Sequence, residues 1–213
     1  TACEAIIINT IKHHFPDHSI LSEEDGATAN TSTFQWIIDP IDGTVNFAHG
    51  VPLCCISIAV KKDAAIVLGA IYNPMMDEFF FAEAGKGAFL NGEPISVSSK
   101  TDFNTAFLVT GFPYHYDEQT DPLRVFSKLI KRGLPIRRLG SAALDLCWVA
   151  CGRFDAFWEY YLNPWDLAAG LLLVREAGGM VTNFKGEQHI IFEPEMLASN
   201  GHIHADLLNE LNS

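Results

Sequence analysis

Two carboxylates and a hydroxyl lie close together in residues 36–47, whose sequence is WIIDPIDGTVNF. An apolar run ends at Asp39, the following proline fixes φ and starts a turn, and Gly43 allows close backbone approach. Asp39 and Asp42 can therefore point into one space beside Thr44. Mg²⁺ prefers such oxygen ligands, together with water and substrate phosphate. The alternative is an ordinary Asp-Pro turn whose polar side chains bond nearby backbone groups.

Acidic residues in two other segments strengthen the metal hypothesis. Glu23 and Glu24 follow a short apolar run, although paired acids in a turn are commonly just solvated. Asp166 stands at the mouth of an apolar helix, where the alternative role is a simple N-cap. Several carboxylates in one pocket repel each other unless cations neutralise them, so together these residues predict a metal site.

The three acidic segments together resemble the inositol monophosphatase family. That family combines an upstream E-E pair with the patterns D-P-x-D-G-T-x-N-F and W-D-x-A-A-G, and the chain carries all three in this order, at residues 23–24, 39–47 and 165–170. The similarity covers nearly the whole chain, since G-S-A-A at 140–143 and E-A-G-G at 176–179 also match. It implies an Mg²⁺-dependent, lithium-sensitive phosphoric monoester hydrolase that cleaves inositol 1-phosphate with metal-activated water.

The resemblance implies two to three Mg²⁺ ions and assigns their ligands. Glu23, Asp39 and the backbone carbonyl of Ile41 would hold one ion. Asp39, Asp42 and Asp166 would hold a second, so that Asp39 bridges the two, and a weaker third ion would lie near Glu23. Two ions roughly 3.5–4 Å apart can clamp the attacking and leaving oxygens of a phosphoryl transfer.

Catalytic and substrate-binding roles follow from the same resemblance. Glu23 and Thr44 would orient the attacking water, with Asp42 as a further catalytic residue. The residues implied in substrate binding are Gly43, Thr44, Ala142, Glu159 and Asp166. The backbone N–H groups of the first two would bind the phosphate of a small phosphorylated polyol.

The alcohol part of the substrate is less well defined by the sequence. Glu159 lies seven residues before Asp166, where inositol-handling members carry a glutamate that binds a ring hydroxyl; the alternative is an exposed residue at a strand end. Fructose-1,6-bisphosphatases, histidinol-phosphatases and nucleotide phosphatases share the metal motifs. Some bacterial relatives also bind RNA polymerase as transcription accessory proteins, a role that would leave only residual phosphatase activity here.

Short β-branched and aromatic runs must position Asp39 and Asp42. Four such runs, separated by turn residues, predict the strands of an antiparallel meander at residues 34–39, 54–62, 64–72 and 78–84. An Asn-Gly pair at 91–92 then predicts a hairpin between residues 88–90 and 94–97.

Strands and helices alternate after residue 100, which is typical of a layered architecture. The expected strands are 106–110, 136–139, 154–160 and 180–184, and the expected helices are 4–15, 121–132, 141–151 and 167–177. Together with the resemblance, this pattern predicts an α/β (α+β layered) fold. We expect an αβαβα sandwich of the sugar-phosphatase type, with a large antiparallel sheet and a smaller mixed sheet.

The chain shows no linker, low-complexity run or repeat, so we expect one domain over residues 1–213. Its first half, 1–100, would bind the metals and its second half, 101–213, would complete the site. The resemblance also implies a homodimer. It further implies N-terminal helices that precede the segment seen here.

Composition restricts the partners. With 14 Lys+Arg against 26 Asp+Glu the net charge is −12, which argues against direct binding of nucleic acid. The 5 cysteines include no C-x-x-C pair, which is typical of reduced thiols in the cytoplasm. No apolar run reaches the roughly 18 residues of a membrane span, and no P-loop, H-E-x-x-H or G-x-S-x-G motif appears. We therefore expect a cytoplasmic protein with no membrane partner.

Overall fold

The residues between 34 and 97 form a long antiparallel meander, as the sequence predicts. The computed structural model describes residues 2–113 and 121–213. Within them the larger sheet has 8 strands in the order β2-β1-β3-β4-β5-β6-β7-β8. These are β1 (Ser19–Ser22), β2 (Gly26–Thr28), β3 (Phe34–Asp42), β4 (Cys55–Lys62), β5 (Ala65–Asn73), β6 (Glu78–Glu83), β7 (Ala88–Leu90) and β8 (Glu93–Ile95).

One pair of strands in this sheet is parallel, which differs from the fully antiparallel sheet that the sequence predicts. β1 forms a hairpin with β2, and the chain then returns to lay β3 along the other edge of β1 in the same direction. Ser22 is paired with Ile38 in this register. The parallel pairing therefore brings the residue after β1, Glu23, to the level of Asp39.

The smaller sheet is mixed, as predicted. Its 5 strands run in the order β10-β9-β11-β13-β12, with β9 parallel to both of its neighbours and β13 antiparallel to both of its own. They are β9 (Leu108–Thr110), β10 (Ile136–Arg137), β11 (Ala156–Glu159), β12 (Met180–Thr182) and β13 (Met196–Ser199). The sequence did not indicate β13, because a four-residue strand buried throughout carries no periodic signal.

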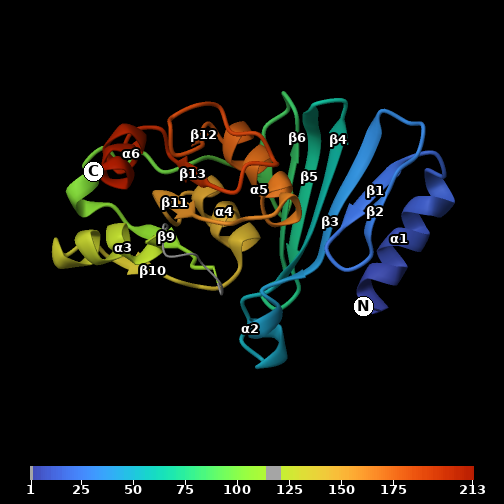
Figure 1. The fold of residues 1–213 in the computed structure, drawn as a ribbon, viewed down its shortest axis with the longest axis horizontal. Coiled ribbons are helices and arrows are strands. Elements are labelled where there is room, and N and C mark those ends of the chain that lie inside the picture. The colour runs from blue at the N-terminus through green and yellow to red at the C-terminus, as the bar shows by residue number, and fades with distance from the viewer. Residues whose placement is uncertain (1, 114–120) are drawn as a thin grey trace.

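The helices separate and cover the two sheets. They are α1 (Ala2–His14), α2 (Thr44–Ala48), α3 (Pro122–Lys131), α4 (Ala142–Ala150), α5 (Pro164–Glu176) and α6 (His204–Asn212), with a 3₁₀ turn η1 (Phe103–Thr105). α4 and α5 lie between the sheets, α1 lies on the outer side of the larger sheet, and α3 and α6 lie beyond the smaller one (Figure 1). This arrangement confirms the predicted αβαβα sandwich.

The hydrophobic core follows these layers. The largest cluster joins the larger sheet, α4, α5 and the smaller sheet, and all nine residues of α4 are buried. A helix covered on every side is apolar all round, which explains why α4 and α5 lack a polar stripe. A second cluster fills the space under α3 and α6, and a third packs Ile8 and Ile11 of α1 against Ile38. Within the residues described above, no helix is long and apolar enough to cross a membrane.

Candidate metal centre

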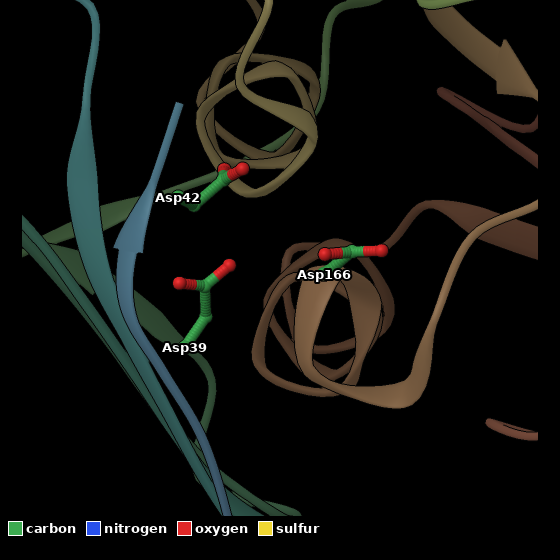
Figure 2. A group of neighbouring side chains, drawn as sticks. All are labelled: Asp39, Asp42 and Asp166. Carbon is green, nitrogen blue, oxygen red and sulfur yellow. The ribbon is translucent and has the colours of Figure 1, made fainter. Parts of the chain in front are cut away.

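Three aspartates from two distant segments meet beside the end of β3. Asp39 and Asp42 come from β3, Asp166 comes from the first turn of α5, and their carboxylates converge (Figure 2). One oxygen of each aspartate lies within 4.8 Å of those of the other two. The structure thus brings together three of the four carboxylates that the sequence assigns to a metal site.

A β-bulge explains why Asp39 and Asp42 face the same space. Asp39 is paired with Ser57 and Asp42 with Cys55, so β3 uses one more residue than β4 over this stretch. Residues three apart in a regular strand face opposite sides, and the extra residue reverses this. The predicted strand end and turn at Asp39 are therefore wrong: β3 continues through Pro40, which a bulge accommodates because it needs no ladder N–H there.

The N-terminus of α4 holds Asp42 in place. Its Oδ2 accepts hydrogen bonds from Ser141 Oγ at 2.6 Å and from the Ala143 backbone N–H at 2.8 Å. Ser141 is also the N-cap of α4, so the same end of the helix organises both its own first turn and the aspartate. All of these contacts fall on one oxygen, which leaves Oδ1 of Asp42 available to a cation.

Asp166 is held by the start of α5, two residues inside the helix. Its Oδ2 accepts a hydrogen bond from the backbone N–H of Asn163 at 2.7 Å. The helix begins at Pro164 with Asn163 as its N-cap, so the expectation of a helix from Leu167 with Asp166 at its cap is wrong. Asp166 is instead the third helical residue, and it reaches back to the cap as the acid of a capping box does.

The turn after β3 requires glycine and exposes a threonine. Gly43 has φ 81°, and a Cβ at this position would lie 2.7 Å from the backbone oxygen of Leu53. Only glycine avoids both the strained backbone and the clash. Thr44 is exposed at the start of α2, and its Oγ1 donates a hydrogen bond to the Ile41 carbonyl at 3.0 Å.

Glu23 lies at the rim of the same cavity. It is exposed, its backbone N–H donates to the Ile38 carbonyl at 3.2 Å, and its side chain interacts with Asp39. It is not part of the tight three-aspartate group. Glu23 can therefore reach a cation or a water molecule on the open side of the cluster.

A cavity of about 400 Å³ contains every residue that the sequence assigns to the site. Ala142 opens α4 at one wall, and Glu159 ends β11 at another. Among the lining residues that were not foreseen from the sequence are Gly111, Arg138 and Asp145. Asp145 could have been recognised as a candidate, because it is an acid within the otherwise apolar run A-A-L-D-L-C. The sequence around Gly111 and Arg138 contains no motif that marks them.

The acids of this cavity favour their protonated forms. Burial raises the pKa of Asp39 to about 9, with the charges of Asp42 and Glu23 adding to the effect. Burial likewise raises the pKa of Asp166 to about 7 and that of Glu159 to about 8. The pKa of Asp42 is also raised by burial, although its hydrogen bonds from Ser141 and Ala143 oppose this. Arg138 is the only cationic residue in the described lining, against six acids, so bound cations would supply the missing positive charge.

The donor set fits a hard divalent cation. The ligand atoms that the cluster offers are carboxylate oxygens, and the described lining of the cavity contains no histidine or cysteine. Oxygen-only sites with room for water and phosphate suit Mg²⁺ rather than Zn²⁺.

Without metal, the unfolding temperature of the protein is expected to fall as the pH rises. The pKa of Asp39 is about 9 and that of Asp166 about 7 in the folded state, against an ordinary value of 3.8. The folded state therefore binds more protons than the unfolded state above about pH 4, and stability declines until about pH 9. We expect a fall of ~5 °C or more between pH 5 and pH 9.

Scanning calorimetry in a chelator, and again in excess Mg²⁺, checks this expectation. Bound cations neutralise the cluster, so the decline should largely disappear with Mg²⁺. The matched control is Asp206→Asn, which removes an exposed carboxylate from α6 and should leave both curves unchanged. An equal decline with and without Mg²⁺ would show that the three aspartates do not dominate the pH dependence.

Comparison with known proteins assigns the chain to a family. The model of the inositol monophosphatase family matches residues 1–213. An inositol-1-monophosphatase from Synechocystis sp. is 43% identical over 212 residues, which cover 98% of this chain and 73% of the relative. A protein named Nus factor SuhB from Escherichia coli is 43% identical over 201 residues, which cover 93% of this chain and 75% of the relative.

A solved structure agrees with the sequence comparison. The inositol monophosphatase from Anabaena (Nostoc) sp. superposes with a TM-score of 0.93 at 43% sequence identity, covering 98% of this chain and 84% of that one. Sequence, fold and the match along the whole chain lead to one assignment: the chain belongs to the inositol monophosphatase family.

Proposed function

We propose that the protein hydrolyses a small phosphomonoester in an Mg²⁺-dependent reaction, with inositol 1-phosphate as the preferred substrate. Phosphatase activity in general follows from membership of the inositol monophosphatase family. The observation that carries the proposal is the convergence of Asp39, Asp42 and Asp166 on one cavity that also contains Glu23 and Thr44.

The proposed ligands divide between two ions. Asp39, Asp42 and Asp166 would hold one ion, and Asp39, Glu23 and the Ile41 carbonyl would hold another, with room at the rim near Glu23 for a third. Bound Mg²⁺ supplies positive charge to the phosphoryl oxygens and lowers the pKa of water. The protein's part is to hold these oxygens in place, which the bulge in β3 and the start of α4 do for Asp42.

Thr44 and Glu23 would orient the attacking water. Because the Thr44 hydroxyl donates its hydrogen to the Ile41 carbonyl, its lone pairs can accept a hydrogen bond from a water molecule. Glu23, at the open rim, can accept the second. A water held in this way would present its oxygen to the phosphorus. The P–O bond to the alcohol would break as the new P–O bond forms, and one proton of the attacking water would pass, through solvent, to the departing alcohol oxygen.

Backbone amides at the start of α2 would bind the phosphate. The first N–H groups of a helix have no partner within it. The N–H groups of Gly43 and Thr44, at the start of α2, are the two amides that the resemblance implies. Ala142 would contact the phosphate or the alcohol from the opposite wall.

A panel of phosphate-release assays tests the proposal. We expect turnover of myo-inositol 1-phosphate to exceed that of fructose 1,6-bisphosphate, histidinol phosphate and adenosine 2′-monophosphate, and to require Mg²⁺. Lithium should inhibit the reaction. If phosphate release from every substrate were as fast in a chelator as in Mg²⁺, the proposed metal dependence would be wrong. If the protein preferred another member of the panel, that compound would take the place of inositol 1-phosphate as the proposed substrate.

A second function has a specific observation in its favour. Relatives named Nus factor SuhB are as similar to this chain as the inositol-1-monophosphatase is, at 43% identity. We keep open a role as a transcription accessory protein that binds RNA polymerase and retains residual phosphatase activity. Capture of purified polymerase by the protein, measured beside phosphate release, separates the two roles.

Two further properties are proposed on the family resemblance. A homodimer is expected, and sedimentation equilibrium over a range of protein concentrations would measure it. The cytoplasm is the expected compartment. Its support is that all five cysteines are free thiols, which suits reducing conditions.

A further inference from the structure

Glu159 belongs to a wall built at the carboxyl ends of two parallel strands. It is the last residue of β11, and β9 runs beside it with Thr110 paired to Trp158. Gly111 follows β9, and a Cβ on it would lie only 2.0 Å from Oε2 of Glu159. The Glu159 carboxyl therefore occupies the space that a side chain at Gly111 would need. Ligands commonly bind at this edge of parallel strands.

Asp145 is a second acid that lines the same cavity. It lies in the first turns of α4 and is 1% exposed. Among the described residues its Oδ1 has no hydrogen-bond partner. Buried polar atoms almost always have one, so an unpartnered carboxylate oxygen at a cavity needs a donor from elsewhere.

Asp145 and Glu159 line the same cavity, together with Arg138. Burial raises the pKa of Asp145 well above its ordinary value, and the charge of Glu159 is the largest of the neighbouring charges that add to this, while Arg138 opposes the shift more weakly. The two carboxyl groups are therefore a pair of acids in one cavity.

The three-aspartate cluster does not explain this pair. The group of oxygens within 4.8 Å of one another includes neither Asp145 nor Glu159. A donor that enters with a ligand could satisfy them instead. Two neighbouring hydroxyl groups on one alcohol supply two O–H donors to two adjacent carboxyl groups, whereas an alcohol without further hydroxyls supplies none.

We propose that Asp145 is a specificity-determining residue that accepts a hydrogen bond from a hydroxyl of the substrate's alcohol part, next to the hydroxyl bound by Glu159. The inference rests on the proposed phosphatase function and specifies its substrate class: phosphomonoesters of alcohols with at least two neighbouring free hydroxyls. Loss of the Asp145 carboxylate weakens binding of such alcohols and leaves the phosphate and its metals untouched.

Steady-state kinetics of three variants test this role. Asp145→Leu keeps the size and removes the acceptor, Asp145→Asn keeps an acceptor oxygen, and Asp206→Asn is a control on an exposed surface of α6. The substrates are myo-inositol 1-phosphate and ethyl phosphate, whose alcohol has no further hydroxyl. We expect Asp145→Leu to lower the ratio of the two kcat/KM values about fivefold, as loss of one hydrogen bond to a neutral acceptor of about 1 kcal/mol does.

The form of the loss distinguishes binding from structure. The change in Asp145→Leu should appear mainly in KM for myo-inositol 1-phosphate, and Asp145→Asn should recover part of it. The unfolding temperature without substrate should not fall, because the leucine fills the space of an unpartnered buried acid. Asp206→Asn should leave the ratio unchanged.

Three results would overturn the inference. An unchanged ratio in Asp145→Leu, whatever the absolute rates, would show that Asp145 does not select the alcohol. A changed ratio with full loss in Asp145→Asn and a lower unfolding temperature in both variants would indicate a structural role. No turnover of either substrate by the wild-type protein in Mg²⁺ would refute the proposed function itself, and the inference with it.

Discussion

Asp42→Asn is expected to lower Mg²⁺-dependent phosphate release by more than ~100-fold, because the loss of an outer partner of a metal ligand already costs 10–100-fold. Oδ2 of Asp42 accepts hydrogen bonds from Ser141 and Ala143, which leaves Oδ1 for the cation. An asparagine would keep one acceptor oxygen for these donors and turn its NH₂ group toward the cation. The substitution therefore replaces a charged ligand with a donor.

The same variant should be at least as stable as the wild type without metal. Burial raises the pKa of Asp42, so its charged form is disfavoured in the folded state. Removing this charge relieves repulsion with Asp39, whose pKa the Asp42 charge also raises. Phosphate-release kinetics over a series of Mg²⁺ concentrations and calorimetry in a chelator measure both effects.

The control for Asp42→Asn is again the exposed Asp206→Asn, which should match the wild type in both measurements. Wild-type turnover in Asp42→Asn at low Mg²⁺ would refute its role as a ligand. An inactive variant with a much lower unfolding temperature would mean that the hydrogen bonds at the start of α4, rather than the charge, are what the reaction needs.

Glu159→Ala is expected to reduce kcat/KM for myo-inositol 1-phosphate by roughly ten- to a hundredfold, and to reduce that for ethyl phosphate much less. Cations bound at the aspartates would favour the ionised form of Glu159, and a hydrogen bond from a hydroxyl to a charged acceptor contributes roughly 1.5–3 kcal/mol. Glu159 lies at the end of β11 and lines the cavity, and it is not part of the three-aspartate group. It can therefore reach the alcohol while the phosphate lies at the metal ligands.

Glu159→Gln is the matched variant, because it keeps the shape that fits against Gly111 and keeps one acceptor oxygen. It should lose less than Glu159→Ala. Equal losses for both substrates would show that Glu159 acts through the structure of the cavity. No loss for either would remove the support for inositol 1-phosphate and favour a sugar-phosphate or nucleotide substrate.

The residues of the metal centre could be predicted from local sequence because each lies in a short segment with its own motif. Asp39, Asp42 and Asp166 stand beside a proline, a glycine and a tryptophan that fix the local chain. The layered fold could be predicted for a similar reason, since the meander and the later alternation of strands and helices repeat over long stretches.

The contacts that hold these residues in position could not be predicted from the local sequence. The hydrogen bond from Ser141 to Asp42 joins residues 99 positions apart, and the bulge in β3 depends on its register with β4. The parallel pairing of β1 depends on the path of the chain after β2. None of these features changes the local pattern of apolar and polar residues, which explains why a turn at Asp39 was the simpler prediction.

The part of the cavity that we propose binds the alcohol could be predicted only in part from the sequence. Glu159 has an interpretable spacing to Asp166. Asp145, however, is an isolated acid in an apolar helix, and Gly111 follows a strand of only three residues. Their proximity arises because β9, β11 and α4 pack together. Only the three-dimensional structure shows that the Glu159 carboxyl fills the space over Gly111.

Whether Asp39, Asp42 and Asp166 form a divalent-cation centre can be measured by anomalous diffraction from crystals grown with Mn²⁺, which replaces Mg²⁺ at oxygen sites. We expect anomalous density between the three carboxylates, with further density on the Glu23 side of Asp39. Crystals of Asp42→Asn at the same Mn²⁺ concentration should show none of it. Crystals of the wild-type protein at saturating Mn²⁺ with no anomalous density among the three aspartates would contradict the proposed cation centre.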